Sequence, residues 1–169
     1  MRAYIRNCTA GGLYFFTVNL AERRGTTLLV DRIGALMDAF RVTNQDHSFA
    51  MPALVVLPDH LHCLWQMPPD DHDFSTRWRL IKSRFSRRIA TGERCSPSRL
   101  RKSERGLWQR RYWEHLIRDE RDYQSHVDYI HFNPVKHGLV ERVADWPYST
   151  FHRHVRNGTL PANWAGLKT

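Results

Sequence analysis

The sequence has few cysteines and no long apolar run, and each absence excludes a class of protein. Its three cysteines, Cys8, Cys63 and Cys95, are odd in number and form no CxxC pair. This excludes a disulfide-stapled extracellular module and favours reduced thiols in the cytoplasm. No segment approaches the roughly 18 apolar residues of a membrane helix. The apolar residues 11–20 lack the small-residue cleavage site of an export signal. We therefore expect a cytoplasmic protein with no membrane partner.

Acidic residues are scarce in the centre of the chain. The 169 residues include 26 Lys and Arg against 17 Asp and Glu, a formal charge of +9. Half of the bases fall between residues 77 and 111, where only Glu93 and Glu104 oppose them. Salt bridges along a helix cannot explain such a pattern, and a phosphate backbone is its natural counterion. The pattern predicts nucleic-acid binding, with these candidate contacts: Arg77, Arg79, Lys82, Arg84, Arg87, Arg88, Arg110 and Arg111.

The length and composition favour one domain over residues 1–169, ending in a tail from about residue 145. Alternating or continuous apolar runs predict strands, and apolar residues at helical spacing predict helices. Because two of the strands are separated only by Pro58-Asp59-His60, they should form a hairpin. The order β-α-β-β-α-β-α indicates an α+β fold, a largely antiparallel sheet with helices packed on it. Strands are expected at 13–20, 49–58, 61–68 and 107–117, and helices at 30–45, 73–92 and 119–138.

Two histidines lie two residues apart in "LVVLPDHLHCLW", residues 54–65. On a strand, His60 and His62 project from the same face. Two neutral imidazoles can hold a divalent metal ion, but two ligands do not make a site. The pair alone is more typical of ordinary surface or core histidines, so a third ligand is needed.

The third ligand is sought in "HVDYIHFNPVKHG", residues 126–138. Tyr129 and Asn133 are four residues apart and share a helix face. The amide oxygen of Asn133 suits Mg²⁺ or Mn²⁺. A phenol attacking a phosphodiester needs its phosphate oriented and neutralised, which such a metal supplies. The group that removes the Tyr129 proton stays open, with metal-bound hydroxide or a histidine such as His126 as options.

Four segments together resemble one known family. They are "LPDHLHCLW", "RWRLIKSRF", "WQRRYWEHLIRDERDYQSHVDYIHFNPVKHGLV" and "DWPYSTFHR". In this order, from about Gly11 to Trp164, they are similar to the REP-associated tyrosine transposases, IS200-type relatives among the HUH single-strand nucleases. The resemblance implies a ferredoxin- or RRM-like HUH nuclease fold. It places the HUH motif on His60-Leu61-His62, the catalytic tyrosine on Tyr129 and the further metal ligand on Asn133.

The resemblance also implies an activity and a partner. Such proteins cut single-stranded DNA, leave a 5′-phosphotyrosine and a free 3′-OH, and can rejoin strands. The REP-associated members bind a repetitive extragenic palindrome folded as a hairpin beside a short guide sequence. The resemblance to them also favours a monomer. The loop "TGERCSPSRLRKSERG", residues 91–106, is longer and more basic than the pattern requires. Its role is left open.

Two other functions remain compatible with these residues. A binding-only module would hold hairpin nucleic acid without cutting it. A metal phosphodiesterase would use water as its nucleophile and retain much activity after Tyr129→Phe. The covalent adduct between Tyr129 and DNA distinguishes the tyrosine transposase from both.

Overall fold

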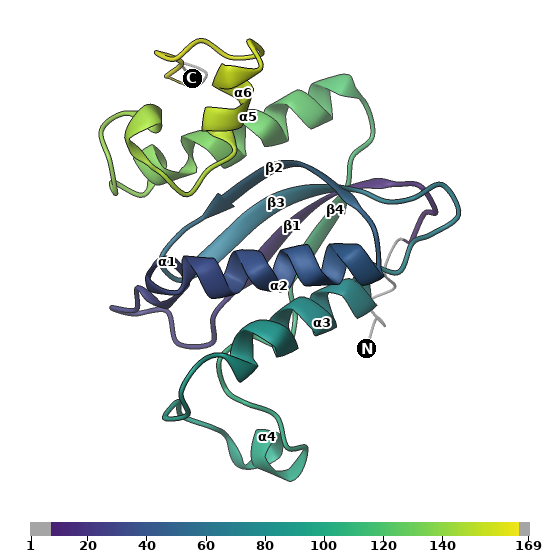
Figure 1. Ribbon diagram of the computed structural model, residues 1–169, viewed down its shortest axis with the longest axis vertical. Helices are drawn as coiled ribbons and strands as arrows, with labels where there is room; N and C mark the ends of the chain where they lie inside the picture. The colour runs from purple at the N-terminus through teal and green to yellow at the C-terminus, as the bar shows by residue number, and fades with distance from the viewer. Residues whose placement is uncertain (1–7, 166–169) are drawn as a thin grey trace, which may run out of the picture.

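The computed structural model describes residues 8–165, which form a sheet with helices on both faces (Figure 1). None of the helices in this range is long and apolar enough to cross a membrane. The elements are β1 (Leu13–Asn19), α1 (Leu28–Asp31), α2 (Ile33–Asp46), β2 (Ala50–Val56), β3 (His60–Gln66), α3 (Phe74–Arg87), α4 (Pro97–Arg101), β4 (Trp113–Leu116), α5 (Glu120–Lys136), the 3-10 turn η1 (Val143–Asp145) and α6 (Phe151–Arg156).

The sheet has the strand order β2-β3-β1-β4, and all its neighbouring strands are antiparallel. This confirms the expected α+β class, and the β-α-β-β-α-β order is the ferredoxin-like arrangement. The central pair β1–β3 sets the register that matters for the site: Thr17 lies opposite His62 and Asn19 opposite His60. On its other side, Thr17 lies opposite Trp113 of β4.

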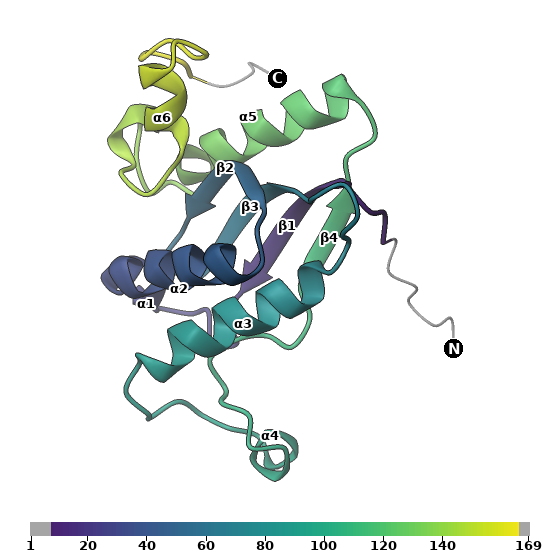
Figure 2. The same ribbon diagram turned by 45° about the vertical axis from the view of Figure 1, so that its right-hand side comes forward.

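The two faces of the sheet are covered differently (Figure 2). Tyr14, Phe16 and Trp65 point towards α2 and α3 and belong to the larger buried cluster. The Trp65 ring stacks on Trp78 of α3 with centroids 4.3 Å apart. The opposite face packs against α5 through a smaller apolar cluster that includes Phe15. Because side chains alternate along a strand, His60 and His62 share this second face.

Helix α5 contains a proline close to its C-terminal end. Proline disfavours helical geometry in the residue before it, yet α5 continues through Asn133-Pro134 to Lys136 without a break. Proline lacks an N–H donor and its ring crowds the carbonyl four residues earlier. Because Pro134 lies in the last turn of α5, few helical hydrogen bonds remain beyond it to be disturbed. The following N–H groups are satisfied, since His137 donates to the Asn133 carbonyl at 3.0 Å and Leu139 to the Pro134 carbonyl at 2.9 Å. Asn133 therefore stays on the same helix face as Tyr129.

Candidate active site

The two histidines of β3 lie beneath α5. Each is 4% exposed, and their ring centroids are 4.9 Å apart at an angle of 85°. His60 begins the strand and His62 follows at the next position on the same face, opposite Thr17. The structure therefore places both imidazoles on the same face of β3, as their spacing in the sequence predicts.

Each imidazole has one ring nitrogen held by a neighbour. His60 Nδ1 donates to Asp59 Oδ1 at 2.6 Å, and Arg23 Nε donates to the other oxygen of that carboxylate at 2.6 Å. His62 Nδ1 lies 2.8 Å from Thr17 Oγ1. Second partners of this kind fix the ring orientation of metal-binding histidines and leave Nε2 for the ion. His62 Nε2 is buried and has no hydrogen-bond partner within residues 8–165.

Burial keeps both rings neutral. It lowers the pKa of His62 to about 3, and electrostatic interactions with His60, His137 and Lys136 lower this pKa further. Burial also lowers the pKa of His60, although Asp59 opposes the shift. Neutral imidazole is the form that binds a metal ion. The electrostatics of the site therefore suit a cation held by nitrogen lone pairs.

Helix α5 brings Tyr129 to this pair. The Tyr129 ring meets the His62 ring edge-on with centroids 5.2 Å apart, and the side chain remains 37% exposed. Phe15 lies against both rings, 5.6 Å from His62 and 6.0 Å from Tyr129. Lys136 Nζ lies 4.8 Å from the centroid of the Tyr129 ring. The phenol thus combines access to solvent with a cationic, well-packed environment.

Asn133, one turn beyond Tyr129, is fully buried, and neither Oδ1 nor Nδ2 has a hydrogen-bond partner among the described residues. A buried amide without partners is costly unless something else satisfies it. A metal ion bound by the Asn133 oxygen and the His62 Nε2 would remove two such deficits. The residues present therefore fit a divalent ion of the Mg²⁺ or Mn²⁺ type.

His137 is a neighbour of the site that the sequence analysis did not select. Its ring lies 5.3 Å from the His60 ring. The signal was available, because positions 129, 133 and 137 recur every four residues and so follow one face of a helix. His137 caps the C-terminal end of α5 and adds another imidazole beside the pair.

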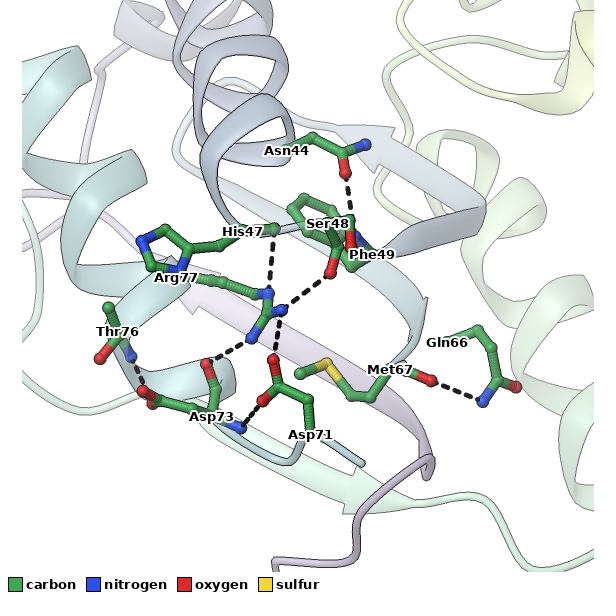
Figure 3. A network of polar contacts seen from close by, with 10 residues as sticks. All are labelled: Asn44, His47, Ser48, Phe49, Gln66, Met67, Asp71, Asp73, Thr76 and Arg77. Carbon is green, nitrogen blue, oxygen red and sulfur yellow. Dashed lines mark hydrogen bonds and ion pairs between the residues drawn. The ribbon is translucent and has the colours of Figure 1, made fainter. Parts of the chain in front are cut away.

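The five arginines of α3 and its C-cap, Arg88, fall into three groups. Arg77 is 2% exposed, and its guanidinium donates to Asp71, to Asp73 and to the carbonyls that follow α2 (Figure 3). It is a structural residue, which corrects its prediction as a DNA contact. Arg84 and Arg88 pair with Asp46 and Asp38 and so tie α3 to α2. Arg79 and Arg87 are exposed and make no ion pair with any described residue.

A groove of about 810 Å³ runs between α3 and residues 99–112. Its cationic lining comes from both sides, with Arg79, Lys82 and Arg87 on α3 and Arg99, Arg105 and Arg110 opposite. Trp108 and Tyr112 supply its aromatic surface. Arg110 and Arg111 are both exposed, and Arg110 pairs with Glu104 at 2.8 Å. The groove therefore combines positive charge with aromatic rings.

The comparisons with known proteins identify the family of the chain. The family described as "Transposase IS200 like" matches residues 11–133. The REP-associated tyrosine transposase of Escherichia coli (strain K12) is 46% identical over 166 residues, 98% of this chain and 92% of the relative. A putative REP-associated tyrosine transposase of Haemophilus influenzae is 44% identical over 167 residues, 98% and 94% of the two chains. The chain belongs to the IS200-like transposase family.

Membership makes the chain an enzyme of the tyrosine transposase class. A solved structure of a REP-associated tyrosine transposase bound to a REP hairpin matches with a TM-score of 0.85 at 45% identity, covering 100% of this chain and 94% of that one. The family match includes His60, His62, Tyr129 and Asn133 and ends at the last of them. His137 lies beyond its end, so its place beside His60 rests on the geometry alone.

A second group of metal-ligand type lies beside the candidate site. His115, Asp122 and His126 are the one set of three His, Cys, Asp or Glu residues in the range 8–165 whose ligand atoms lie within 4.8 Å of one another. His115 Nε2 is 2.9 Å from Asp122 Oδ2, and Arg118 Nε donates to the same oxygen at 3.1 Å. Burial alone would raise the pKa of Asp122, but hydrogen bonds from His115 and Arg118 hold it well below its usual range.

Hydrogen bonds join the members of this group to one another, since both histidines bond to Asp122. His60 and His62 instead bond to residues outside their pair. His126 Nδ1 donates to the backbone carbonyl of Asp122 at 2.7 Å, which leaves its Nε2 as a lone pair. The His126 ring rests on Phe15, with centroids 4.7 Å apart. Sequence analysis missed the group because its members come from β4 and α5, which only the fold brings together.

The loop 91–106 is tied to α3 rather than left unsupported. Arg105 pairs with Glu93 at 2.6 Å and also donates to the Ile89 carbonyl at 2.8 Å. Arg99 donates to the Trp108 carbonyl at 2.8 Å. The loop that departs from the expected pattern therefore forms one wall of the basic groove.

Proposed function

We propose that the chain cuts and rejoins single-stranded DNA beside a REP-type hairpin, with Tyr129 as the nucleophile. The observation that carries the proposal is the Tyr129 phenol lying against His62, whose Nε2 has no partner in the described part of the chain. His60, His62 and Asn133 would hold a Mg²⁺ or Mn²⁺ ion. When bound, that ion would orient the scissile phosphate and neutralise its developing charge.

The chemistry assigned to the chain is a phosphoryl transfer. Tyr129 Oη forms a bond to phosphorus while the bond from phosphorus to the 3′ oxygen breaks, giving a 5′-phosphotyrosine and a free 3′-OH. The phenol proton must leave to a base, and the departing 3′ oxygen must gain a proton. His126, whose Nε2 is a lone pair, stays a candidate for the base. The covalent bond preserves the energy needed for rejoining.

The basic groove would hold the hairpin by its phosphates. We assign this role to Arg79, Lys82, Arg87, Arg110 and Arg111, which lie on α3 and on the segment before β4. Arg84 and Arg88 are bound to acids of α2, and Arg110 is bound to Glu104, so these three would contribute less. Each phosphate contact should steepen the loss of affinity with salt. We further propose that the chain acts as a monomer.

The test is adduct formation on a labelled oligonucleotide that folds as the host's REP hairpin with a single-stranded flank. The protein is incubated with Mg²⁺ or Mn²⁺ and run on a denaturing gel. A DNA–protein band that requires the metal and disappears in Tyr129→Phe supports the proposal. Tyr123→Phe is the matched control, because Tyr123 lies on the same helix away from the histidines and should retain the band.

Two outcomes would select the other functions. Hairpin binding without any adduct would indicate a binding-only module. Cutting by both wild type and Tyr129→Phe, with no adduct, would indicate water as the nucleophile. Replacing His60 and His62 together by alanine should abolish the adduct but leave hairpin binding, because the groove and not the metal supplies most of the affinity.

A further inference from the structure

Trp113 is a large apolar side chain left open on the outermost strand of the sheet. It begins β4, an edge strand, and is 60% exposed. Its neighbours point to the opposite face: the Tyr112 ring lies 5.9 Å from Phe16 and 6.0 Å from Trp78, and Glu114 is buried. Exposed edge strands normally carry charges rather than tryptophan. The position therefore calls for a partner.

The register places Trp113 in one row with the candidate catalytic residues. Thr17 lies opposite Trp113 on one side and opposite His62 on the other. Thr17 also contacts His62 Nδ1 at 2.8 Å, so these side chains share one face. Two strand spacings separate Trp113 from His62, roughly 10 Å. A molecule lying across this row would touch both residues.

The row of Trp113 is the more open part of this sheet face. Helix α5 packs mainly over β2 and β3, and it reaches β4 at His115, two residues beyond Trp113, where Asp122 and His126 contact the imidazole. Phe15, opposite His115, is buried, whereas Thr17, opposite Trp113, remains partly exposed. Trp113 and Thr17 therefore form a partly exposed strip that leads from the sheet edge towards His62 and Tyr129.

The same edge separates the strip from the basic groove. Tyr112 lines the groove on the α3 side, and the next residue, Trp113, projects from the α5 side. A strand that leaves a hairpin in the groove can therefore reach the site around the edge of β4. Arg111, exposed two residues before Trp113, places a positive charge on that path.

We propose that Trp113 is a stacking platform for an unpaired base of the DNA strand whose phosphate reaches Tyr129. The inference rests on the proposed function and extends it to a residue that positions the single strand. Aromatic rings on open sheet faces and in single-strand grooves stack on bases without needing a particular sequence. A base in a duplex offers no free face, so the ligand is a nucleotide of the single-stranded flank next to the cut.

The experiment measures binding without metal in a Tyr129→Phe background, so that no cutting interferes. Two hairpins are compared, one with the single-stranded flank and one blunt. Trp113→Ala should weaken binding of the flanked hairpin about 5- to 150-fold, the usual effect of losing one stacked base. Binding of the blunt hairpin should not change. Trp113→Phe should retain most of the affinity, and Met37→Ala, an exposed apolar residue of α2, should behave as the parent.

A scan with abasic nucleotides then locates the base. One abasic position in the flank should weaken binding to the Tyr129→Phe parent but not to the variant that also carries Trp113→Ala. Equal losses for flanked and blunt hairpins, or additive losses at every abasic position, would overturn the inference. If wild type forms the adduct but Trp113→Ala does not change binding, the role of Trp113 as a stacking platform is refuted and the proposed nucleophile is not. If the abasic effect depends on Trp113 but wild type forms no adduct, the assignment of Tyr129 as the nucleophile is refuted and the stacking platform is not.

Discussion

Arg77→Ala should separate a structural arginine from the DNA-binding arginines on the same helix. The Arg77 guanidinium lies between two connections, the turn after α2 and the turn before α3 (Figure 3). It donates to the carbonyls of His47 at 3.1 Å, Ser48 at 2.8 Å and Asp73 at 2.9 Å. It also pairs with Asp71 at 2.7 Å. Removing it leaves all four acceptors without this donor.

The expected loss of stability follows from these contacts. Breaking a buried ion pair by deleting one partner costs about 3–5 kcal/mol. The lower part of that range applies, because the Asp71 side chain is 35% exposed and can be rehydrated. At about 2–4 °C per kcal/mol for a chain of this size, a loss of about 3–4 kcal/mol lowers Tm by about 6–16 °C.

Thermal unfolding followed by circular dichroism measures the effect, with Arg79→Ala as the matched control. Arg79 is an exposed arginine of the same helix, so its variant should keep the wild-type Tm but bind hairpin DNA less tightly. Arg77→Ala should have a lower Tm than wild type but should bind hairpin DNA as tightly at a temperature where it remains folded. A Tm within about 2 °C of wild type, accompanied by weakened DNA binding, would show that the assignment of Arg77 as structural is wrong.

Three further results are expected. Asp59→Asn should raise the metal concentration that gives half-maximal adduct about 10- to 100-fold, because the carboxylate that orients His60 is lost; an unchanged metal requirement would contradict this. Arg105 holds the pKa of Glu93 at about 2, below its ordinary 4.5. The free energy of unfolding of wild type should therefore decrease as the pH falls from about 4.5 to about 2. In Glu93→Gln the side chain at position 93 cannot titrate, so the urea midpoint of this variant should fall less over the same pH range. Each of Arg79→Ala and Arg87→Ala should reduce the salt slope of hairpin binding by about 1.

The sequence predicted the fold class well, because the apolar patterns of its strands and helices are strong. The hairpin of β2 and β3 follows from two apolar runs joined by a short turn, and α3 follows from a clear apolar stripe. Register is harder, since a strand slipped by two residues shows the same faces. No local pattern could have placed Trp113 and His62 on either side of Thr17.

The sequence also selected the histidines, Tyr129 and Asn133, because spacing along one strand and one helix determines a shared face. It misassigned Arg77 for a reason that is visible in hindsight. Phe74 and Ile81 belong to the apolar stripe of α3, and Arg77 lies three residues after one and four before the other. Helical spacing therefore placed it on the buried face, and a count of charges could not show this.

The three aromatic residues before and in β4 show where sequence reasoning stops. Trp108, Tyr112 and Trp113 are all aromatic residues close to basic residues in the sequence, so the sequence alone does not tell which of them could stack on a base. Burial removes Trp108, which is 6% exposed, and strand alternation sends Tyr112 to the face of α3. Trp113 differs because β4 ends the sheet and because α5 contacts β4 at His115, two residues further along the strand. Both facts are properties of the assembled sheet, so the residue best placed to hold the single strand could be identified only from the fold.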